Sequence, residues 1–366
     1  MRGLMPGVMG RGLLENTPQP LIEVGNLFTW GNNDHGQLGD GSTTNRNTPT
    51  LIGGELWRYM AGGNEHSLGI RSDGRLLSWG RNGFGQLGDG TTVSKHTPTL
   101  IGTDTWISVA AGNEHSLGIR SDGRLLSWGG NGEGQLGDGT TVAKHTPTLI
   151  GTDTWIYIGA GDFHSLGIRS DMRLFTWGWN ISGQLGNGTY ANSLIPTLIG
   201  VDIWSVIYGG NVHSLGIRGD GRLLAWGGNS VFQLGDGTTT NRSTPTLIGG
   251  DTWNRIYCRN NSSFGIRSDN RLLSWGSNIH GQLGDGTTTN RSTPTLIGGD
   301  TWRRISGRNS TLGIRSDGRL LSWGSNSHGQ LGQGAIGSVI NPLLLGTHLW
   351  LNVFIGNNHS LGIMTI

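Results

Sequence analysis

The sequence predicts an all-β fold: a seven-bladed β-propeller closed by pairing of its N- and C-terminal strands. Three observations predict it. A tryptophan-glycine motif returns at a nearly fixed interval, each copy contains a turn signal, and the two chain ends carry half-copies. A period near 50 residues with internal turns is typical of propellers and other closed β arrays.

The tryptophan-glycine motif recurs after 49 residues five times and then after 48 residues. Its tryptophans are Trp30, Trp79, Trp128, Trp177, Trp226, Trp275 and Trp323. A second tryptophan series runs in parallel, at Trp57, Trp106, Trp155, Trp204, Trp253, Trp302 and Trp350. This spacing indicates many small packed units, rather than the roughly two or three separate domains that a chain of this length could hold.

Each copy contains a predicted hairpin, which residues 66–80 (HSLGIRSDGRLLSWG) illustrate. Asp73 and Gly74 predict a two-residue turn, because both residue types tolerate the positive φ of a type I′ turn. Pairing outward from that turn places Leu68 opposite Trp79 on one bulky face. The opposite face carries small side chains, which would suit stacking against the bulky face of the next blade.

The rest of each copy is predicted to be loop, with one short outer edge strand in the TPTLI segment, where proline needs no ladder donor. The first copy (27–30) lacks a preceding strand, and the last copy (359–366) lacks a following one. We expect these two segments to pair and complete one blade, which removes exposed sheet edges. Six complete hairpins and this assembled one make seven. Residues 1–24 are predicted to be a separate tail and residues 25–366 the propeller.

Residues 110–141 (AAGNEHSLGIRSDGRLLSWGGNGEGQLGDGTT) resemble the regulator of chromosome condensation repeat. The resemblance extends over about residues 25–366, through the repeated G-x-x-HSL, SDG, WG-x-N and GQLG elements. Within that family the chain is most similar to the near-identical arrays of bacteria and bacteriophages. The resemblance implies a seven-bladed propeller, in agreement with the hairpin count.

The name-giving member of the family is an exchange factor for a small GTPase and binds nucleosomes. The resemblance therefore implies guanine nucleotide exchange as one alternative function. That activity depends on a protruding β-wedge, whereas the tryptophan spacing here never exceeds 49 residues and leaves no room for an extra hairpin. A basic chromatin-binding tail is also missing, since residues 1–24 carry two arginines against two glutamates.

Composition excludes several other classes. Charged residues make up 14% of the chain and the formal net charge is +2, which gives no case for attraction to nucleic acid or a membrane surface. Cys258 is the one cysteine, so neither an intrachain disulfide nor a thiolate metal cluster can form. No apolar run of 18 residues predicts a membrane span. The first residues lack the apolar core of a signal peptide, so synthesis in the cytosol is expected.

The histidines of the HSL motif are His66, His115, His164, His213 and His359. A ring of imidazoles could bind a metal ion or an anion. A structural histidine bonded at the start of a strand is the favoured interpretation, because the fifth and sixth copies lack the histidine altogether.

Arginine pairs flank the hairpin turns and could form a basic rim of about +6 that docks an acidic partner. They are Arg71 and Arg75, Arg120 and Arg124, Arg169 and Arg173, Arg218 and Arg222, Arg267 and Arg271, and Arg315 and Arg319. The alternative is that these long side chains cover apolar edges and stay solvated. No aromatic residues alternate with these arginines, which disfavours nucleic acid as the partner.

The second tryptophan series could form sugar-stacking platforms, because its members lie in contexts such as TDTW and GDTW. Packing between blades is the favoured role, since tryptophan buries a large area. GQLGDG lacks both the spaced carboxylates of a calcium loop and the GK[ST] of a phosphate loop, so it predicts a turn. A search for positions unique to one blade finds no convergent catalytic set. We therefore expect no enzyme activity, no cofactor and no metal.

Near-identical blades favour a structural or interaction role over catalysis. The leading hypothesis is a protein-interaction propeller, as a phage or virion assembly component that serves as a tail, decoration or adhesion protein tethered through residues 1–24. The alternatives are a lectin-like carbohydrate-binding propeller and a guanine nucleotide exchange factor.

Overall fold

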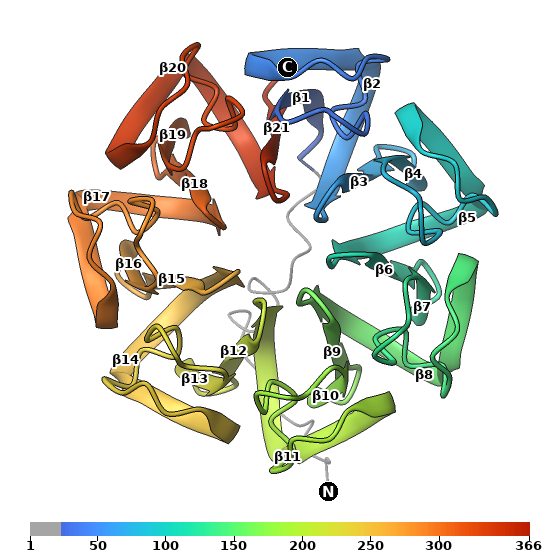
Figure 1. The fold of residues 1–366 in the computed structure, drawn as a ribbon, viewed down its shortest axis with the longest axis vertical. Coiled ribbons are helices and arrows are strands. Elements are labelled where there is room, and N and C mark those ends of the chain that lie inside the picture. Colours follow the sequence, from blue (N-terminus) through green and yellow to red (C-terminus); the bar gives the residue numbers. More distant parts are fainter. Residues whose placement is uncertain (1–22) are drawn as a thin grey trace, which may run out of the picture.

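The computed structural model describes residues 23–366 as an all-β fold whose strands close into a propeller-like ring (Figure 1). The predicted tail, residues 1–24, lies outside the described residues except for its last two. Residues 23–366 contain no helix that is long and apolar enough to cross a membrane.

Each repeat contributes one long strand and two short ones. The long strands are β2 (Arg46–Gly62), β5 (Lys95–Ala111), β8 (Lys144–Ala160), β11 (Ser193–Gly209), β14 (Arg242–Arg259), β17 (Arg291–Gly307) and β20 (Val339–Ile355). The first short strands are β3 (His66–Arg71), β6 (His115–Arg120), β9 (His164–Arg169), β12 (His213–Arg218), β15 (Ser262–Arg267), β18 (Ser310–Arg315) and β21 (His359–Met364). The second short strands are β1 (Gly25–Gly31), β4 (Arg75–Gly80), β7 (Arg124–Gly129), β10 (Arg173–Gly178), β13 (Arg222–Gly227), β16 (Arg271–Gly276) and β19 (Arg319–Gly324).

Each long strand belongs to two neighbouring sheets. The first half of β5 pairs with β4, with Leu100 opposite Leu77, and its second half pairs with β6, with Trp106 opposite Arg120. The TPTLI segment is thus an outer strand, as predicted. It continues through the segment predicted to be loop and becomes the first strand of the next sheet, which couples neighbouring blades covalently.

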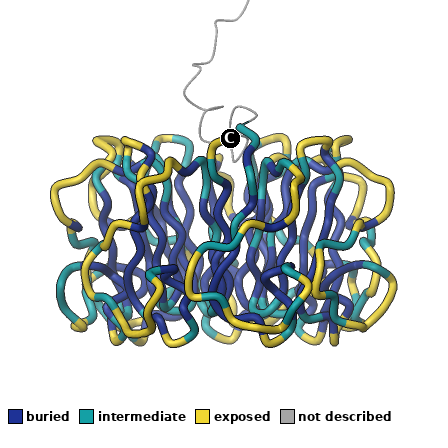
Figure 2. Tube along the Cα trace, turned by 90° about the horizontal axis from the view of Figure 1, so that it is seen from above, coloured by how far each residue is buried: buried dark blue, intermediate teal, exposed yellow. Residues whose placement is uncertain are grey.

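The ring closes through the two ends of the chain. Strand β1 pairs antiparallel with β21, from Asn26 opposite Met364 to Gly31 opposite His359. The predicted pairing of these half-copies is confirmed. It places the first described residues and the C-terminus on the same side of the ring (Figures 1 and 2).

The hairpin turn contains three residues, 72–74, and the predicted two-residue turn is wrong. Gly74 donates a backbone hydrogen bond to the carbonyl of Arg71 over 2.9 Å and has a φ of 88°, the left-handed position that ends such a turn. Leu68 therefore lies opposite Ser78. A shift of one residue moves side chains to the other face, so Leu68 and the motif tryptophan lie on opposite faces of the blade.

The core consists of layers between blades, seen as the buried band in Figure 2. Leu68 packs with Trp106 and Trp128 of the next blade. Trp57 lies over Gly69, where a Cβ would come within 2.5 Å of its ring. Small residues on the strands therefore make room for tryptophans of the same blade, rather than for the next blade as predicted.

Candidate functional site

The arginine rim is largely neutralised. Arg71 contacts Asp73 over 2.6 Å and Glu55 over 2.5 Å, and it lowers the pKa of Asp73 to about 2. In each of the other five pairs the first arginine likewise contacts two carboxylates. These arginines are Arg120, Arg169, Arg218, Arg267 and Arg315. The second carboxylate lies 15 or 16 residues before the arginine and was not counted in the predicted charge of +6. Two arginines therefore face two carboxylates in each copy.

The second tryptophan series is buried, which contradicts the sugar-stacking hypothesis. Trp57, Trp106, Trp155, Trp204, Trp253, Trp302 and Trp350 are only 1–4% exposed. Trp106 packs edge-on against Trp128 with ring centroids 5.7 Å apart, and the equivalent pairs repeat around the ring. A sugar-stacking platform needs an exposed ring face, and these tryptophan rings are buried.

The HSL histidines link neighbouring blades. Nε2 of His359 lies 3.1 Å from the hydroxyl of Ser67, which itself donates to the carbonyl of Gln37. The serine's proton is thereby used, so the imidazole donates through Nε2. Burial lowers the pKa of His359 to about 3, so the ring is neutral at pH 7. The same histidine-serine contact joins His66, His115, His164 and His213 to the next copy. The structural interpretation of the histidines agrees with this geometry, but their partner is a side chain of the next blade.

Comparison of the copies with one another reveals positions that depart from the repeat. Two residues after the second tryptophan stand Tyr59, Ser108, Tyr157, Val206, Arg255, Arg304 and Asn352. Four residues after it stand Ala61, Ala110, Gly159, Tyr208, Tyr257, Ser306 and Phe354. Six residues after it stand Gly63, Gly112, Gly161, Gly210, Arg259, Arg308 and Gly356.

These divergent positions come together at the ring centre, because the second halves of the long strands run inward (Figure 1). Departures from the repeat that lie in separate copies therefore meet in one place, which the search for a catalytic set in the sequence did not reveal. A cavity of about 60 Å³ lies there, lined by residues of β2, β5, β8, β11, β14 and β20. We call it the channel pocket. In the sequence, the residues that line this pocket are spread between Tyr59 and Ile355.

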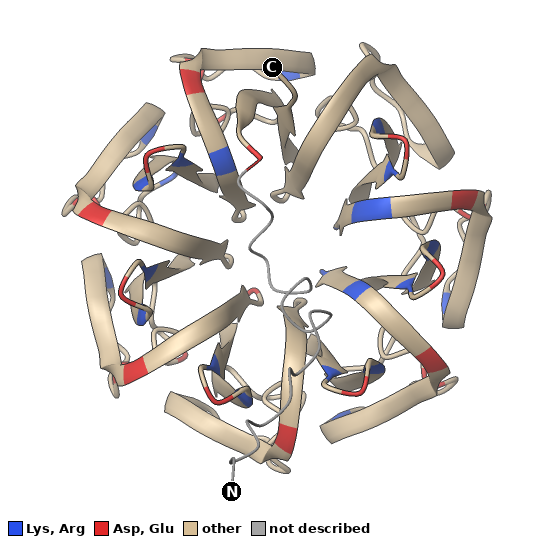
Figure 3. Ribbon diagram, turned by 180° about the vertical axis from the view of Figure 1, so that it is seen from behind, with Lys and Arg blue, Asp and Glu red and all other residues tan. Residues whose placement is uncertain are grey.

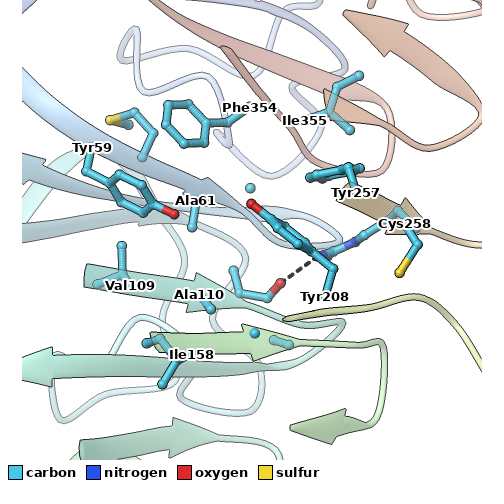
Figure 4. Close-up of a pocket in the computed structure, with 16 residues that line it drawn as sticks. Tyr59, Ala61, Val109, Ala110, Ile158, Tyr208, Tyr257, Cys258, Phe354 and Ile355 are labelled. Atoms are coloured by element: carbon cyan, nitrogen blue, oxygen red, sulfur yellow. Dashed lines mark hydrogen bonds between the residues drawn. The ribbon is translucent and has the colours of Figure 1, made fainter. Parts of the chain in front are cut away.

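One wall of the channel pocket is aromatic. The rings of Tyr208 and Tyr257 lie 4.9 Å apart, and those of Tyr59 and Phe354 lie 5.1 Å apart. Figure 4 shows the hydroxyl groups of Tyr59 and Tyr208 pointing toward the middle of the pocket. Burial, followed by the neighbouring tyrosines, raises the pKa of Tyr59 well above its usual value. The hydroxyl groups therefore stay protonated at neutral pH and can donate hydrogen bonds.

Arg255 and Arg304 lie toward the end of the channel that has the hairpin turns, opposite Ile266 and Ile314 on the neighbouring strands, and Arg303 beside them donates to the carbonyls of Trp350 and Leu351 of the next blade. We call these three residues the mouth cluster. Burial, then the neighbouring Arg255 and Arg303, lowers the pKa of Arg304 to about 10. None of the three forms a salt bridge within residues 23–366, unlike the rim arginines, but the Glu23 carboxylate acts on Arg304 in the opposite direction and offsets part of the repulsion. Figure 3 shows basic segments on some of the inward-running strands and none on others.

At the other end lie Arg259 and Arg308, which we call the floor arginines. Arg259 donates through Nη1 to the carbonyl of Ala111, on a strand of another blade, over 2.8 Å. Nη2 of Arg308 lies 3.5 Å from Oδ1 of Asp162. Both contacts reach to other copies of the repeat, so the floor arginines tie distant blades together.

Two further grooves lie on the outside of the ring, with volumes of about 530 and 570 Å³. Both are lined by the same repeat positions in successive copies, such as Asp89 and Lys95 in one and Asp138 and Lys144 in the other. They are therefore repeated features rather than a specialised site. Among the described residues no group of three or more histidine, cysteine or acidic side chains is arranged to hold a metal ion.

The comparisons with known proteins agree with the repeat pattern. The family model described as "Regulator of chromosome condensation (RCC1) repeat" matches residues 24–70, 73–119, 122–168, 171–217, 220–258 and 269–307. A second model of the same description matches residues 58–86, 106–135, 155–184 and 306–330. No curated protein sequence matches the chain.

Several solved structures share the fold. A chain in the crystal structure of Kap60 bound to yeast RCC1 (Prp20) aligns with a TM-score of 0.88 and 18% identity, over 100% of this chain and 95% of that one. Prp20p from Saccharomyces cerevisiae aligns with a TM-score of 0.87 and 19% identity, over 99% and 96%. Human WBSCR16 aligns with a TM-score of 0.82 and 20% identity, over 93% and 99%. At these identities the likeness establishes the fold alone.

Proposed function

The chain belongs to the regulator of chromosome condensation (RCC1) repeat family, and we propose that it is a seven-bladed, non-enzymatic interaction propeller that docks an acidic protein surface at its mouth cluster. The blade count assigns one blade to each hairpin: β3–β4, β6–β7, β9–β10, β12–β13, β15–β16, β18–β19 and β21–β1. Each blade then has four strands, because a long strand flanks every hairpin on both sides.

The observation that supports docking is the unpaired charge of the mouth cluster. Arg255 and Arg304 occupy a position that holds serine, valine or asparagine in other copies, so the repeat fold does not require arginine there. Like charges held together destabilise the folded chain, which is typical of functional sites. An acidic partner would relieve that repulsion on binding and gain steered association. The neutral rim offers no comparable attraction.

We expect the substitutions Arg255→Ser and Arg304→Ser together to abolish recovery of the partner. Serine occupies the equivalent position at Ser108, so the fold should tolerate the change. The measurement is fractionation of the native source by size, followed by mass spectrometry of what co-migrates with the wild-type and altered chains. We expect at least a tenfold loss, and recovery from wild type that falls with added salt.

A matched control removes the same charge elsewhere. Lys95→Ser with Lys144→Ser acts on the outer grooves, where the equivalent residue Ser193 already exists in another copy. This control should recover the partner as wild type does. Equal losses in both double variants would contradict docking at the mouth cluster, as would migration of the wild-type chain as a free monomer.

Guanine nucleotide exchange is a second candidate, favoured by the fold shared with Prp20p, whose structure is described together with its binding to Gsp1p and histones. We expect a chain with this function to accelerate release of a fluorescent guanine nucleotide from a small GTPase of its own host. Catalytic amounts should suffice, and the Arg255→Ser and Arg304→Ser chain should be slower if the GTPase docks at the mouth cluster. No acceleration with any host GTPase removes this candidate.

Association with a phage or virion through residues 1–24 remains a prediction from the sequence. The fractionation described above tests it, since a structural component would co-migrate with a large particle in fixed stoichiometry. Carbohydrate binding through the second tryptophan series is not proposed, because those tryptophans are buried.

A further inference from the structure

The floor arginines carry more positive charge than their surroundings balance. Arg259 and Arg308 are only 6% and 4% exposed. Asp162 is the one carboxylate in ion-pair contact with either of them among residues 23–366. The group therefore buries a net charge of +1, and an uncompensated buried charge is strongly unfavourable.

The floor arginines also have unused hydrogen-bond donors. Nε of Arg259 and Nη1 of Arg308 are buried and have no partner within the described chain. Their other nitrogens are engaged, as Arg259 Nη1 with the carbonyl of Ala111 and Arg308 Nε with Oδ1 of Asn260 over 2.7 Å. Buried donors in native proteins nearly always have a partner, including a water molecule or an ion. Free donors together with a net positive charge indicate an anion.

The floor arginines differ from the residue that most copies of the repeat have at this position. Five of the seven copies have glycine at this position. The two copies with arginine are also the two that lack the HSL histidine, having Ser262 and Ser310 instead. Both of these changes affect the same end of the channel, because the long strand ends opposite the start of the following short strand. Both of these copies therefore carry the same two differences from the repeat: each lacks the imidazole and has a guanidinium group instead.

The channel pocket supplies space beside Arg259, which is one of its lining residues. A volume of about 60 Å³ holds roughly four water-sized atoms, at about 15 Å³ for each. That space admits a tetrahedral or carboxylate oxyanion. Tyr59 and Tyr208 line the same pocket and can donate from their protonated hydroxyl groups (Figure 4).

We propose that the channel pocket is a binding site for a small oxyanion, held by the floor arginines below and by tyrosine hydroxyl groups at its wall. The anion balances the buried charge, accepts hydrogen bonds from the unused guanidinium donors, and enters through the mouth cluster, whose positive charge attracts it. This site requires no partner protein, so it stands independently of the docking function.

The test is isothermal titration of the wild-type chain with inorganic phosphate, sulfate and acetate at constant ionic strength maintained with chloride. We expect saturable binding of at least one oxyanion to a single site per chain. Arg259→Gly and Arg308→Gly should each weaken that binding at least tenfold. Both variants restore the residue that the other copies have, so the strands need no new conformation.

Two further measurements separate the site from general salt effects. Thermal unfolding should shift upward with the bound oxyanion for wild type and not for Arg259→Gly, because a ligand stabilises only the state that binds it. Tyr208→Ala, which matches Ala61 and Ala110, should weaken binding without altering the buried charge. The Lys95→Ser and Lys144→Ser chain, which loses two positive charges on the outer surface, should bind as wild type does.

Absence of saturable binding of phosphate, sulfate and acetate to the folded wild-type chain would overturn the proposal. So would equal binding by wild type and both glycine variants. Neither result would bear on the docking function, because the titration contains no protein other than this chain.

Discussion

Lowering the pH from 7 to 5 should remove about 9 kcal/mol from the free energy of unfolding, through five buried histidines alone. Burial lowers the pKa of His66, His115, His213 and His359 to about 3 and that of His164 to about 4. In the unfolded chain each imidazole titrates near 6.5. The unfolded state therefore takes up about five more protons than the folded state at pH 5.

The protein loses stability as the pH falls, because the unfolded chain binds protons at a higher pH than the folded protein does. Because the folded pKa values lie below the unfolded value, this stability is fully present above pH 6.5 and is lost as the pH falls toward 3. Urea unfolding at a series of pH values measures the effect. The slope of the unfolding free energy against pH should approach about 7 kcal/mol per unit between pH 5.5 and 4.5, which corresponds to five protons.

His164→Ser should reduce that slope by one proton, since four buried histidines remain. Serine already occupies the equivalent position at Ser262, so the blade should accept it. The control Val93→Ala removes an exposed side chain that does not titrate and should leave the slope unchanged. A slope that is flat between pH 6 and 4.5 would mean that the histidines are protonated in the folded protein, which contradicts the neutral histidine-serine links.

Trp106→Ala should destabilise the protein by about 3–5 kcal/mol, the usual cost of removing a fully buried large aromatic side chain. Trp106 is 1% exposed and packs against Trp128 of its own blade and Leu68 of the preceding one. A Cβ on Gly118 would lie 2.4 Å from its ring, so the backbone is shaped to hold this side chain. Deletion leaves a cavity that the rigid strands cannot fill.

The free energy of unfolding in urea at pH 7.5 measures this loss. Val93→Ala is the matched control, because Val93 is 62% exposed and contributes little burial. A loss below 1 kcal/mol for Trp106→Ala would contradict the packing role and reopen the question of an exposed, ligand-stacking tryptophan.

Much of the fold follows from the sequence. The tryptophan-glycine interval of 48–49 residues determines the repeat, and the half-copies at the two ends determine that the ring closes by pairing β1 with β21. These conclusions depend on local patterns that the chain repeats many times, so an error in one copy is corrected by the others. The same redundancy identifies the TPTLI segment as a strand, with its proline at the outer edge of the sheet.

The number of residues in the turn at 72–74 could not be predicted from the sequence. Asp-Gly is compatible with two-residue and three-residue turns, and the difference of one residue reverses the faces of the hairpin. The structure favours the longer turn, in which Asp73 also accepts a hydrogen bond from the backbone of Arg75 over 3.1 Å. That choice decides which side chains face the neighbouring blade.

The sequence by itself determined the repeat, the closure of the ring and the turn-forming character of the loops. The tertiary structure alone decided where the charges and aromatic rings meet. Arg259, Arg308, Tyr59 and Asp162 are far apart in the chain and follow no motif, because each departs from the repeat in a different copy. A closed ring turns the inner end of every blade toward one axis, so single departures in separate copies become neighbours around that axis.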